Sequence, residues 1–215
     1  MTNRDRTITV RQARRTTFVD ERTWEAFGEF KAGIIGRKGE STVARELTRL
    51  GLPALHDVIL ADMFGVTQVD HLVRALEAII VIETKTYGGH ITGTLHSHEW
   101  VQHLASGETR HPFLNPLHQN HRHCRAVEAA IAGFDVPIAG IVVSAGNATF
   151  CDDLQGAVVP VDRLIEVLNR LSSRARDPAA LEKAWLCLVS AVTTAEARRV
   201  EHGEMVRRRQ QGSAL

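Results

Sequence analysis

At 215 residues, the chain has the length of one domain with extensions or of two small domains. Its 44% hydrophobic and 24% charged residues predict a globular protein with a real core, and its longest purely apolar run, residues 78–82, is too short to cross a bilayer. Three scattered cysteines argue against a disulfide framework or a cysteine-based zinc ribbon, and the net charge of +1 gives no sign of a polyanionic partner.

Arginines gather near both ends of the sequence. Residues 1–15 hold five arginines against one aspartate, and five more lie between residues 198 and 209. Such runs can neutralise the phosphates of a nucleic acid, although solvated tails explain them equally well. Residues 1–15 also lack the apolar stretch of a signal peptide, so we expect a cytoplasmic protein without membrane contact.

The first half of the chain predicts two helices and then three strands. One helix is expected over residues 20–35 and, after a break at Gly36 and Gly39, a second over residues 40–50, with apolar residues at helical spacing. The apolar pattern then changes to that of β-strands. The three strands are expected at residues 55–60, 68–75 and 78–86.

The second half predicts a return to helices around further strands. A glycine-rich turn (88–93) and a polar, irregular segment (100–116) lead to a helix (117–132), strands (137–144 and 157–161), a helix (163–171) and a last helix (178 to about 207). Helices on a mixed sheet give a three-layer α/β fold. We divide the chain into a basic arm with a helix (1–35), a central domain (36–172) and a C-terminal helical extension (173–215).

Charged residues interrupt the most apolar strand at its end. Glu83 and Lys85 stand two residues apart, so both side chains are predicted on one face of the sheet. If the preceding hairpin turns at residues 76–77, Asp70 lies opposite Glu83. Two carboxylates about 5 Å apart at their Cβ atoms repel each other unless a cation lies between them.

This pattern suits the metal-assisted hydrolysis of a phosphodiester. Magnesium commonly takes one or two carboxylates together with phosphate and water, and a lysine beside it can stabilise the charge that develops on the phosphate. By itself the spacing of Asp70, Glu83 and Lys85 also fits a surface ion pair. Their place at the end of a buried strand favours the catalytic interpretation.

The chain resembles the nuclease-related domain family, which is similar to the PD-(D/E)xK nucleases. The resemblance implies a three-layer restriction-endonuclease-like core with a mixed central sheet flanked by helices, plus N- and C-terminal helical extensions, and it runs from about Gly36 to Ser144 and more weakly to Leu171. Six motif pieces carry it, in the family's order: Gly39-Glu40, Gln68–Val73, Ile82–Lys85, Gly88–Gly93, Trp100 and Asn115-Pro116-x-x-Gln119.

The resemblance also implies roles for individual residues. Asp70 and Glu83 would be the acidic metal ligands, the main-chain carbonyl of Thr84 a third ligand, and Lys85 the catalytic lysine. Glu40 would face the same metal, directly or through water. Gln119 is similar to a helix glutamine that supports the metal site or the lysine, but four residues later, where a tyrosine is common, this chain has His123.

The sequence therefore predicts a Mg²⁺- or Mn²⁺-dependent deoxyribonuclease, endo or exo, with a catalytically silent nucleic-acid-binding module in a larger DNA-processing or defence complex as the alternative. DNA is the expected partner, and a homodimer is one way for a small site to cut both strands. Eight of the eleven histidines fall between residues 90 and 123. A structural zinc site at His121, His123 and Cys124 is weighed against ordinary exposed or hydrogen-bonded histidines.

Overall fold

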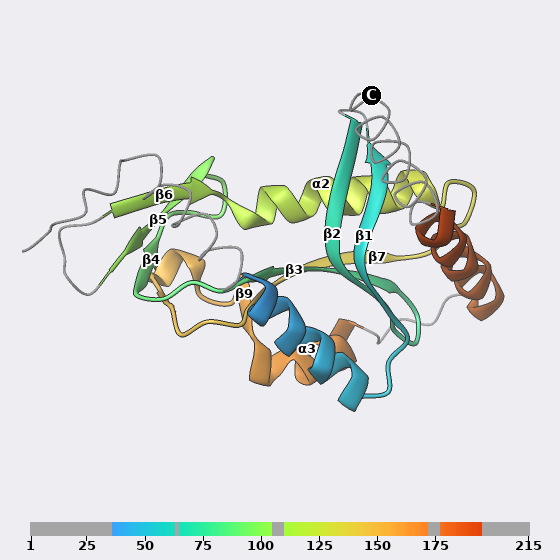
Figure 1. Cartoon of the computed structure of the whole chain (residues 1–215), viewed down its shortest axis with the longest axis horizontal. Helices are drawn as coiled ribbons and strands as arrows, with labels where there is room; N and C mark the ends of the chain where they lie inside the picture. The colour runs from blue at the N-terminus through green and yellow to red at the C-terminus, as the bar shows by residue number, and fades with distance from the viewer. Residues whose placement is uncertain (1–35, 63–64, 105–109, 172–176, 195–215) are drawn as a thin grey trace, which may run out of the picture. The chain divides into compact units, whose positions relative to one another are not determined.

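The computed structural model describes residues 36–62, 65–104, 110–171 and 177–194 (Figure 1). These residues belong to one compact unit that begins at residue 35. The helix expected over residues 20–35 and both arginine-rich ends lie outside the described residues.

A five-stranded mixed sheet forms the centre of the unit. β1 (Ala54–Asp62), β2 (Gly65–Arg74) and β3 (Ile79–Lys85) form an antiparallel meander, close to the three predicted strands. β7 (Ile138–Ser144) runs parallel to β3, and β9 (Val158–Pro160) runs parallel to β7, which gives the order β1-β2-β3-β7-β9. The sheet is therefore mixed, as predicted.

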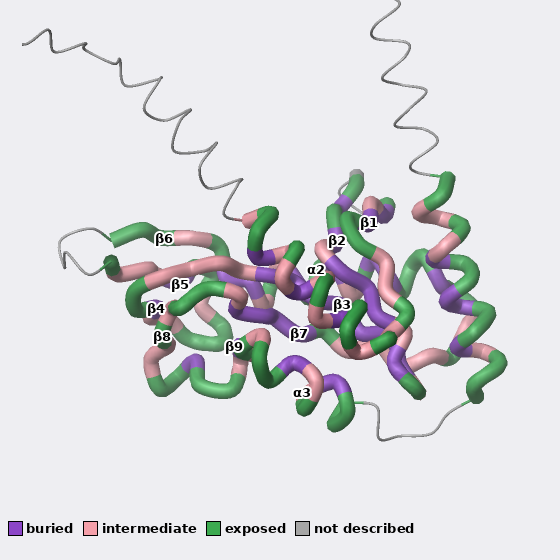
Figure 2. The backbone as a smooth tube through the Cα atoms, turned by 60° about the horizontal axis from the view of Figure 1, so that its bottom comes forward, coloured by how far each residue is buried: buried purple, intermediate pink, exposed green. Residues whose placement is uncertain are grey.

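Helices cover both faces of this sheet, because the strands alternate apolar side chains between the two faces. Ile80 and Ile82 of β3 pack with the helix of residues 36–49 and with α3 (Leu164–Leu171). Val81, on the opposite face of β3, packs with α2 (Pro116–Ala130). Figures 1 and 2 show these two helical layers around strands β3 and β7, which are mostly buried. The predicted three-layer α/β core is confirmed.

Three of the four strands of a second mixed sheet lie in the part of the chain that the sequence predicted to be a turn and an irregular segment. This sheet consists of β4 (His90–Thr92), β5 (Glu99–His103), β6 (Arg110–Leu114) and β8 (Thr149–Phe150), in the order β6-β5-β4-β8. The predictions for residues 88–93 and 100–116 are wrong here. These strands are short and polar on their exposed face, so few apolar residues, such as Ile91, Trp100 and Phe113, reveal them.

The helix expected to begin at residue 40 begins earlier, because residues 36–49 form one helix that contains Gly39, whereas the segment before Gly36 lies outside the described residues. Gly39 is buried, and a Cβ atom at this position would lie 2.0 Å from Thr86 Oγ1 and 3.3 Å from Ala145 Cβ. The missing side chain therefore lets the start of the helix approach the end of β3. This approach, rather than a turn, explains the glycine.

The helix of residues 178–194 contributes to the same core as β1, β2 and α2. Leu181, Trp185 and Leu188 are 6%, 6% and 0% exposed and pack in that core. No helix among the described residues is both long and apolar enough to span a membrane.

Candidate active site

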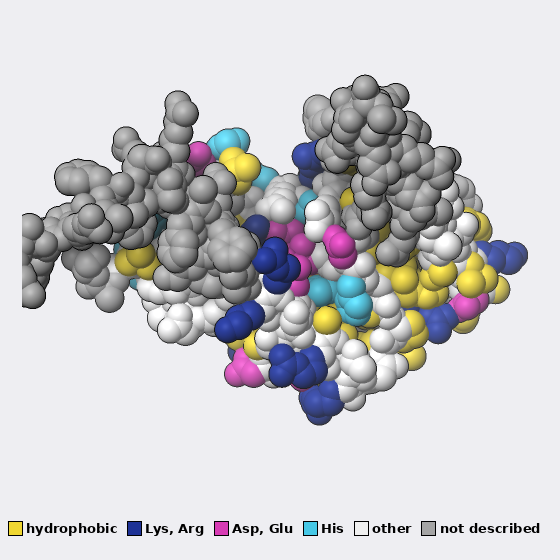
Figure 3. All heavy atoms as spheres, in the orientation of Figure 1, with side chains coloured by type: hydrophobic (Ala, Val, Ile, Leu, Met, Phe, Trp, Pro, Cys, Tyr) yellow, Lys and Arg dark blue, Asp and Glu magenta, His cyan; other side chains and the backbone are white. Residues whose placement is uncertain are grey.

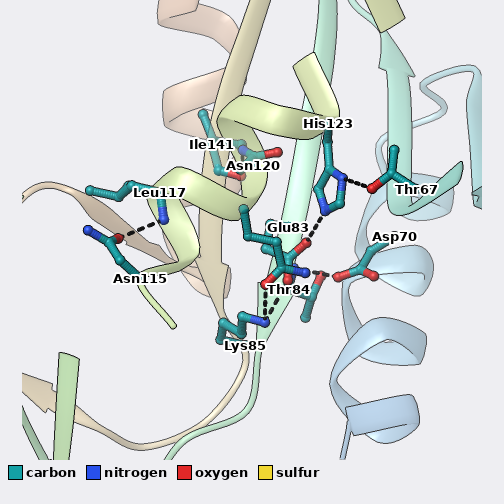
Figure 4. A network of polar contacts seen from close by, with 11 residues as sticks. Thr67, Asp70, Glu83, Thr84, Lys85, Asn115, Leu117, Asn120, His123 and Ile141 are labelled. Atoms are coloured by element: carbon teal, nitrogen blue, oxygen red, sulfur yellow. Dashed lines mark hydrogen bonds and ion pairs between the residues drawn. The ribbon is translucent and has the colours of Figure 1, made fainter. Parts of the chain in front are cut away.

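The site begins where β2 separates from β3. Their ladder runs from Arg74 opposite Ile79 to His71 opposite Ile82, which is the predicted register, and it ends one position before Asp70 and Glu83. Beyond this point, a side chain replaces the backbone as the hydrogen-bond partner of β3: Asp70 Oδ2 accepts a 2.7 Å hydrogen bond from the Thr84 N–H (Figure 4). Asp70 is thereby fixed against the end of β3.

Glu83 and Lys85 face the same side of β3, as their spacing predicted. The Glu83 side chain is only 2% exposed, and its Oε1 lies 2.7 Å from Lys85 Nζ. Lys85 Nζ also donates a 2.9 Å hydrogen bond to Gln119 Oε1 on α2. The Lys85 side chain is 21% exposed, so the ammonium group lies at the boundary between the core and solvent.

The start of α2 is fixed by Asn115. Its Oδ1 caps the helix by accepting the Leu117 N–H at 2.9 Å, while Pro116 occupies the first turn, where its missing N–H costs nothing. Asn115 Nδ2 donates to the carbonyls of Leu95 and Ser97, which ties the helix to the loop between β4 and β5. This cap sets the position of Gln119 one turn later.

His123 follows Gln119 by four residues, so both side chains lie on one face of α2. The His123 side chain is 3% exposed, with Nε2 3.1 Å from Glu83 Oε2 and Nδ1 2.8 Å from Thr67 Oγ1 on β2 (Figure 4). The departure from the family pattern at this position therefore places an imidazole directly against Glu83.

The Asp70 carboxyl group has a raised pKa because it is buried and lies near other carboxylates. Its pKa is raised from 3.8 to about 7, first by burial, then by the Glu83 carboxylate and to a smaller extent by Glu40, against the lowering effect of the Thr84 N–H and of Lys85. For the Lys85 amine, burial acts to lower the pKa, but the charge of Glu83 and the hydrogen bond to it, with Tyr87 and Asp70, outweigh burial and raise the pKa above 10.5. Lys85 is therefore an ammonium group at neutral pH.

Glu40 lies in the helix of residues 36–49 and is partly buried. Its charge contributes to the raised pKa of Asp70, so this carboxylate lies within electrostatic range of the same point. Gly39, beside it in the sequence, fixes the approach of this helix to Thr86, one residue beyond Lys85. The structure thus brings Glu40, Asp70, Glu83, Lys85 and Gln119 to the end of β3.

The donor atoms of this site fit a magnesium or manganese ion. Among the described residues, no three side chains of His, Cys, Asp or Glu converge as a group that could hold a metal ion by themselves. Magnesium does not need such a cage, since it keeps several waters and uses one or two carboxylates. Asp70 and Glu83 supply two carboxylates, and a cation would relieve the repulsion that raises the pKa of Asp70.

The residues of the alternative zinc site, His121, His123 and Cys124, do not form a set of metal donors. His121 is exposed, while His123 is engaged by Glu83 and Thr67. Burial is the main cause that raises the pKa of the Cys124 thiol to about 11, which disfavours the thiolate that zinc binds. Over residues 36–62, 65–104, 110–171 and 177–194 there is no histidine and cysteine cluster with metal-site geometry.

Comparison with known proteins places this arrangement in a family. A family model described as a nuclease-related domain matches residues 35–145, which is more than half of the chain. The chain belongs to the nuclease-related domain family. An uncharacterized protein of Bacillus anthracis is 37% identical to it over 97 residues, which cover 43% of this chain and 45% of that protein. The chain therefore spans less than half of this relative's length, and no solved structure shows a significant match.

The site residues that the sequence predicted lie on four elements: the helix of residues 36–49, β2, β3 and the first turns of α2. Thr67 and the contact of His123 with Glu83 were not foreseen. A signal for His123 existed, since it follows Gln119 at the spacing of one helical face. Nothing in the local sequence marks Thr67, because its contact with α2 depends on the bend of β2 away from β3.

Proposed function

We propose that this protein is a Mg²⁺- or Mn²⁺-dependent deoxyribonuclease that hydrolyses phosphodiester bonds at the end of β3. The observation that carries the proposal is the buried Glu83 carboxylate, 2.7 Å from a lysine that stays protonated and beside a second carboxylate, Asp70, whose pKa is strongly raised. Carboxylates held together against their repulsion, in a family named for its relation to nucleases, favour a functional site over a structural ion pair.

Each residue has a role that its contacts support. Asp70 and Glu83 would hold the cation, with the Thr84 carbonyl as a further ligand and Glu40 as a ligand directly or through water. When bound, a divalent cation polarises the phosphate and makes water a stronger nucleophile. Lys85, as an ammonium group, would stabilise the negative charge that develops on the phosphate. Gln119 holds Lys85 Nζ in place from α2.

The surface near the carboxylates offers positive charge to a DNA backbone. Figure 3 shows acidic side chains in the middle of one face with Lys and Arg side chains beside them. Arg37 and Lys38, on the same helix as Glu40, are both exposed. Cations on the rim would offset the repulsion between phosphates and the acidic centre, and they would be worth more in low salt than in high salt.

A cleavage assay with three variants tests the proposal. Wild-type protein is incubated with supercoiled plasmid, linear duplex and single-stranded DNA in Mg²⁺, in Mn²⁺ and in EDTA. Asp70→Ala, Glu83→Ala and Lys85→Ala should each lower the rate by roughly a hundredfold or more, because each removes a ligand or a charge that acts on the reacting phosphate. Asp153→Ala, which removes an exposed carboxylate from another part of the chain, should cut like the wild type.

Two results would contradict the proposal. Cleavage by Lys85→Ala protein at the wild-type rate would mean that the activity belongs to a contaminant or to another site. DNA binding without cleavage in any of the metals would support the alternative, a catalytically silent nucleic-acid-binding module. The three DNA forms also separate endonuclease from exonuclease action.

A further inference from the structure

A chain of two buried hydrogen bonds leads from β2 through α2 to Glu83. Thr67 Oγ1 lies 2.8 Å from His123 Nδ1, and His123 Nε2 lies 3.1 Å from Glu83 Oε2. The three residues are 6%, 3% and 2% exposed, so water does not compete for these contacts. None of the site roles assigned above uses Thr67 or His123.

The geometry restricts where the protons lie. A carboxylate can only accept a hydrogen bond, so His123 Nε2 must carry a hydrogen to bond Glu83 Oε2. A hydroxyl can either donate or accept, so Thr67 Oγ1 matches Nδ1 whichever of the two carries the hydrogen. The contact of Thr67 with Nδ1 therefore holds the ring so that Nε2–H faces Glu83.

The remaining contacts show what this N–H does for Glu83. Lys85 Nζ engages Oε1 of the carboxylate and His123 engages Oε2, so each oxygen has a donor on a different element. Two donors on separate oxygens fix the rotation of the carboxylate, which a single ion pair with a flexible lysine does not. Partners that orient a metal ligand in this way typically change metal affinity or activity by about 10- to 100-fold when they are lost.

We propose that Thr67 and His123 are positioning residues, which orient the Glu83 carboxylate for the cation: Thr67 holds the His123 ring, and the ring presents Nε2–H to Glu83 Oε2. This inference rests on the proposed function, since it concerns the same metal centre. In this proposal, His123 contacts Glu83 and does not itself coordinate the cation. Its side chain therefore controls how well Glu83 binds metal, while the chemistry stays with Asp70, Glu83 and Lys85.

Paired substitutions at Thr67 separate the hydrogen bond from packing. Thr67→Val keeps the shape of the side chain and removes the hydroxyl, whereas Thr67→Ser keeps the hydroxyl. Direct Mn²⁺ binding, measured from the loss of the free-ion electron paramagnetic resonance signal, should weaken about tenfold in Thr67→Val and stay near the wild-type value in Thr67→Ser. His123→Leu should weaken binding more than His123→Gln, which retains an N–H donor. Thermal unfolding of each variant checks that it is folded.

A metal-independent measurement tests the contact between His123 and Glu83. Long-range ¹H–¹⁵N spectra of the imidazole rings, with His123 assigned through His123→Gln, should show a hydrogen on Nε2. The signals of this ring should change in Glu83→Gln and in Thr67→Val, because each substitution removes one partner of the ring. An Nε2 without a hydrogen, or a ring whose signals are the same in both variants, would overturn the inference.

The outcomes also distinguish this inference from the proposed function. If the wild type binds no Mn²⁺, the metal centre itself is wrong and both proposals fail. If the wild type binds Mn²⁺ and Thr67→Val binds it equally well, the positioning role alone fails. A nitrogen ligand detected by electron spin echo on bound Mn²⁺, and lost in His123→Gln, would show that His123 is a direct ligand and would also overturn the positioning role.

Discussion

At the scale of one residue, the Asp70 carboxyl group of the candidate site lowers the stability of the fold when it ionises. Its carboxyl group is partly buried beside Glu83 and within range of Glu40, and its pKa is raised to about 7 mainly by burial and by the Glu83 charge. The Thr84 N–H fixes it in this place. The protein thus keeps a carboxyl group where its ionisation is costly, and a bound cation at the proposed site would lower this cost.

The first prediction is that Asp70→Asn stabilises the metal-free protein at pH 8. A raised pKa means that the folded state holds its proton between pH 3.8 and about 7 while the unfolded state has lost it, so stability falls as the pH rises through this range. At 1.36 kcal/mol per pH unit, this effect is at most roughly 4 kcal/mol, and asparagine removes it. Urea unfolding in EDTA at pH 4 and pH 8 measures the difference.

Two controls accompany this measurement. Asp153→Asn, at an exposed carboxylate, should leave the stability nearly unchanged at both pH values. Added Mg²⁺ should stabilise the wild type at pH 8 but not Asp70→Asn. An Asp70→Asn protein that is less stable than the wild type at pH 8 would show that the ionisation of Asp70, against burial and the Glu83 charge, does not lower the stability of the fold.

At the scale of elements, close backbone approaches hold the second sheet and the site together. Gly89 has φ 75°, and a Cβ atom there would lie 2.1 Å from the carbonyl oxygen of His103. β4 and β5 pair through His90 opposite His103, directly beside this contact. Gly89 therefore allows the close pairing of β4 with β5.

The second prediction compares Gly89→Ala with Gly133→Ala. Both glycines have positive φ, 75° and 101°, but only Gly89 has an atom within 4 Å of the added Cβ. Gly133→Ala should cost about 1–2 kcal/mol from backbone strain alone. Gly89→Ala should cost at least roughly 2 kcal/mol more, because the His103 carbonyl cannot move without breaking the ladder. Equal losses in urea unfolding would mean that β4 and β5 separate easily.

At the scale of the whole molecule, the proposed binding of DNA depends on the distribution of charge. The chain has a net charge of +1, yet residues 1–15 hold five arginines against one aspartate. A polyanion gains affinity from local positive charge and counterion release, not from net charge. The arginine-rich ends lie outside the described residues, so their part in DNA binding remains a prediction from the sequence.

The third prediction is that deletion of residues 1–15 reduces the salt dependence of DNA binding. Each lost phosphate contact should lower the slope of log affinity against log salt by about 0.9 on duplex DNA, for all sequences alike. Binding of Lys85→Ala protein in EDTA measures the slope without cleavage. Replacing the five arginines with lysine should preserve the slope and replacing them with glutamine should not. An unchanged slope after deletion would direct attention to Arg37, Lys38 and Arg110, which are exposed.

The sequence by itself determined the central layers and the register of the strands that carry the candidate site. Alternation along β2 and β3 and the length of their hairpin predicted the pairing observed from Arg74 opposite Ile79 to His71 opposite Ile82, because a period of two and a short turn leave few registers for a strand with one buried face. The apolar stripes of the flanking helices predicted the layers for the same reason. Local pattern suffices where the neighbours in space are also neighbours along the chain.

Only the tertiary structure decided the second sheet, the place of Gly39 and the contacts of His123. The short strands β4, β5, β6 and β8 bury few apolar residues, and their pairing joins segments from residue 90 to residue 150. Gly39 meets Thr86 and Ala145, and His123 meets Thr67 and Glu83, across distances of about 40 to more than 100 residues along the chain. These contacts form only when separate elements pack, so no local period or spacing encodes them.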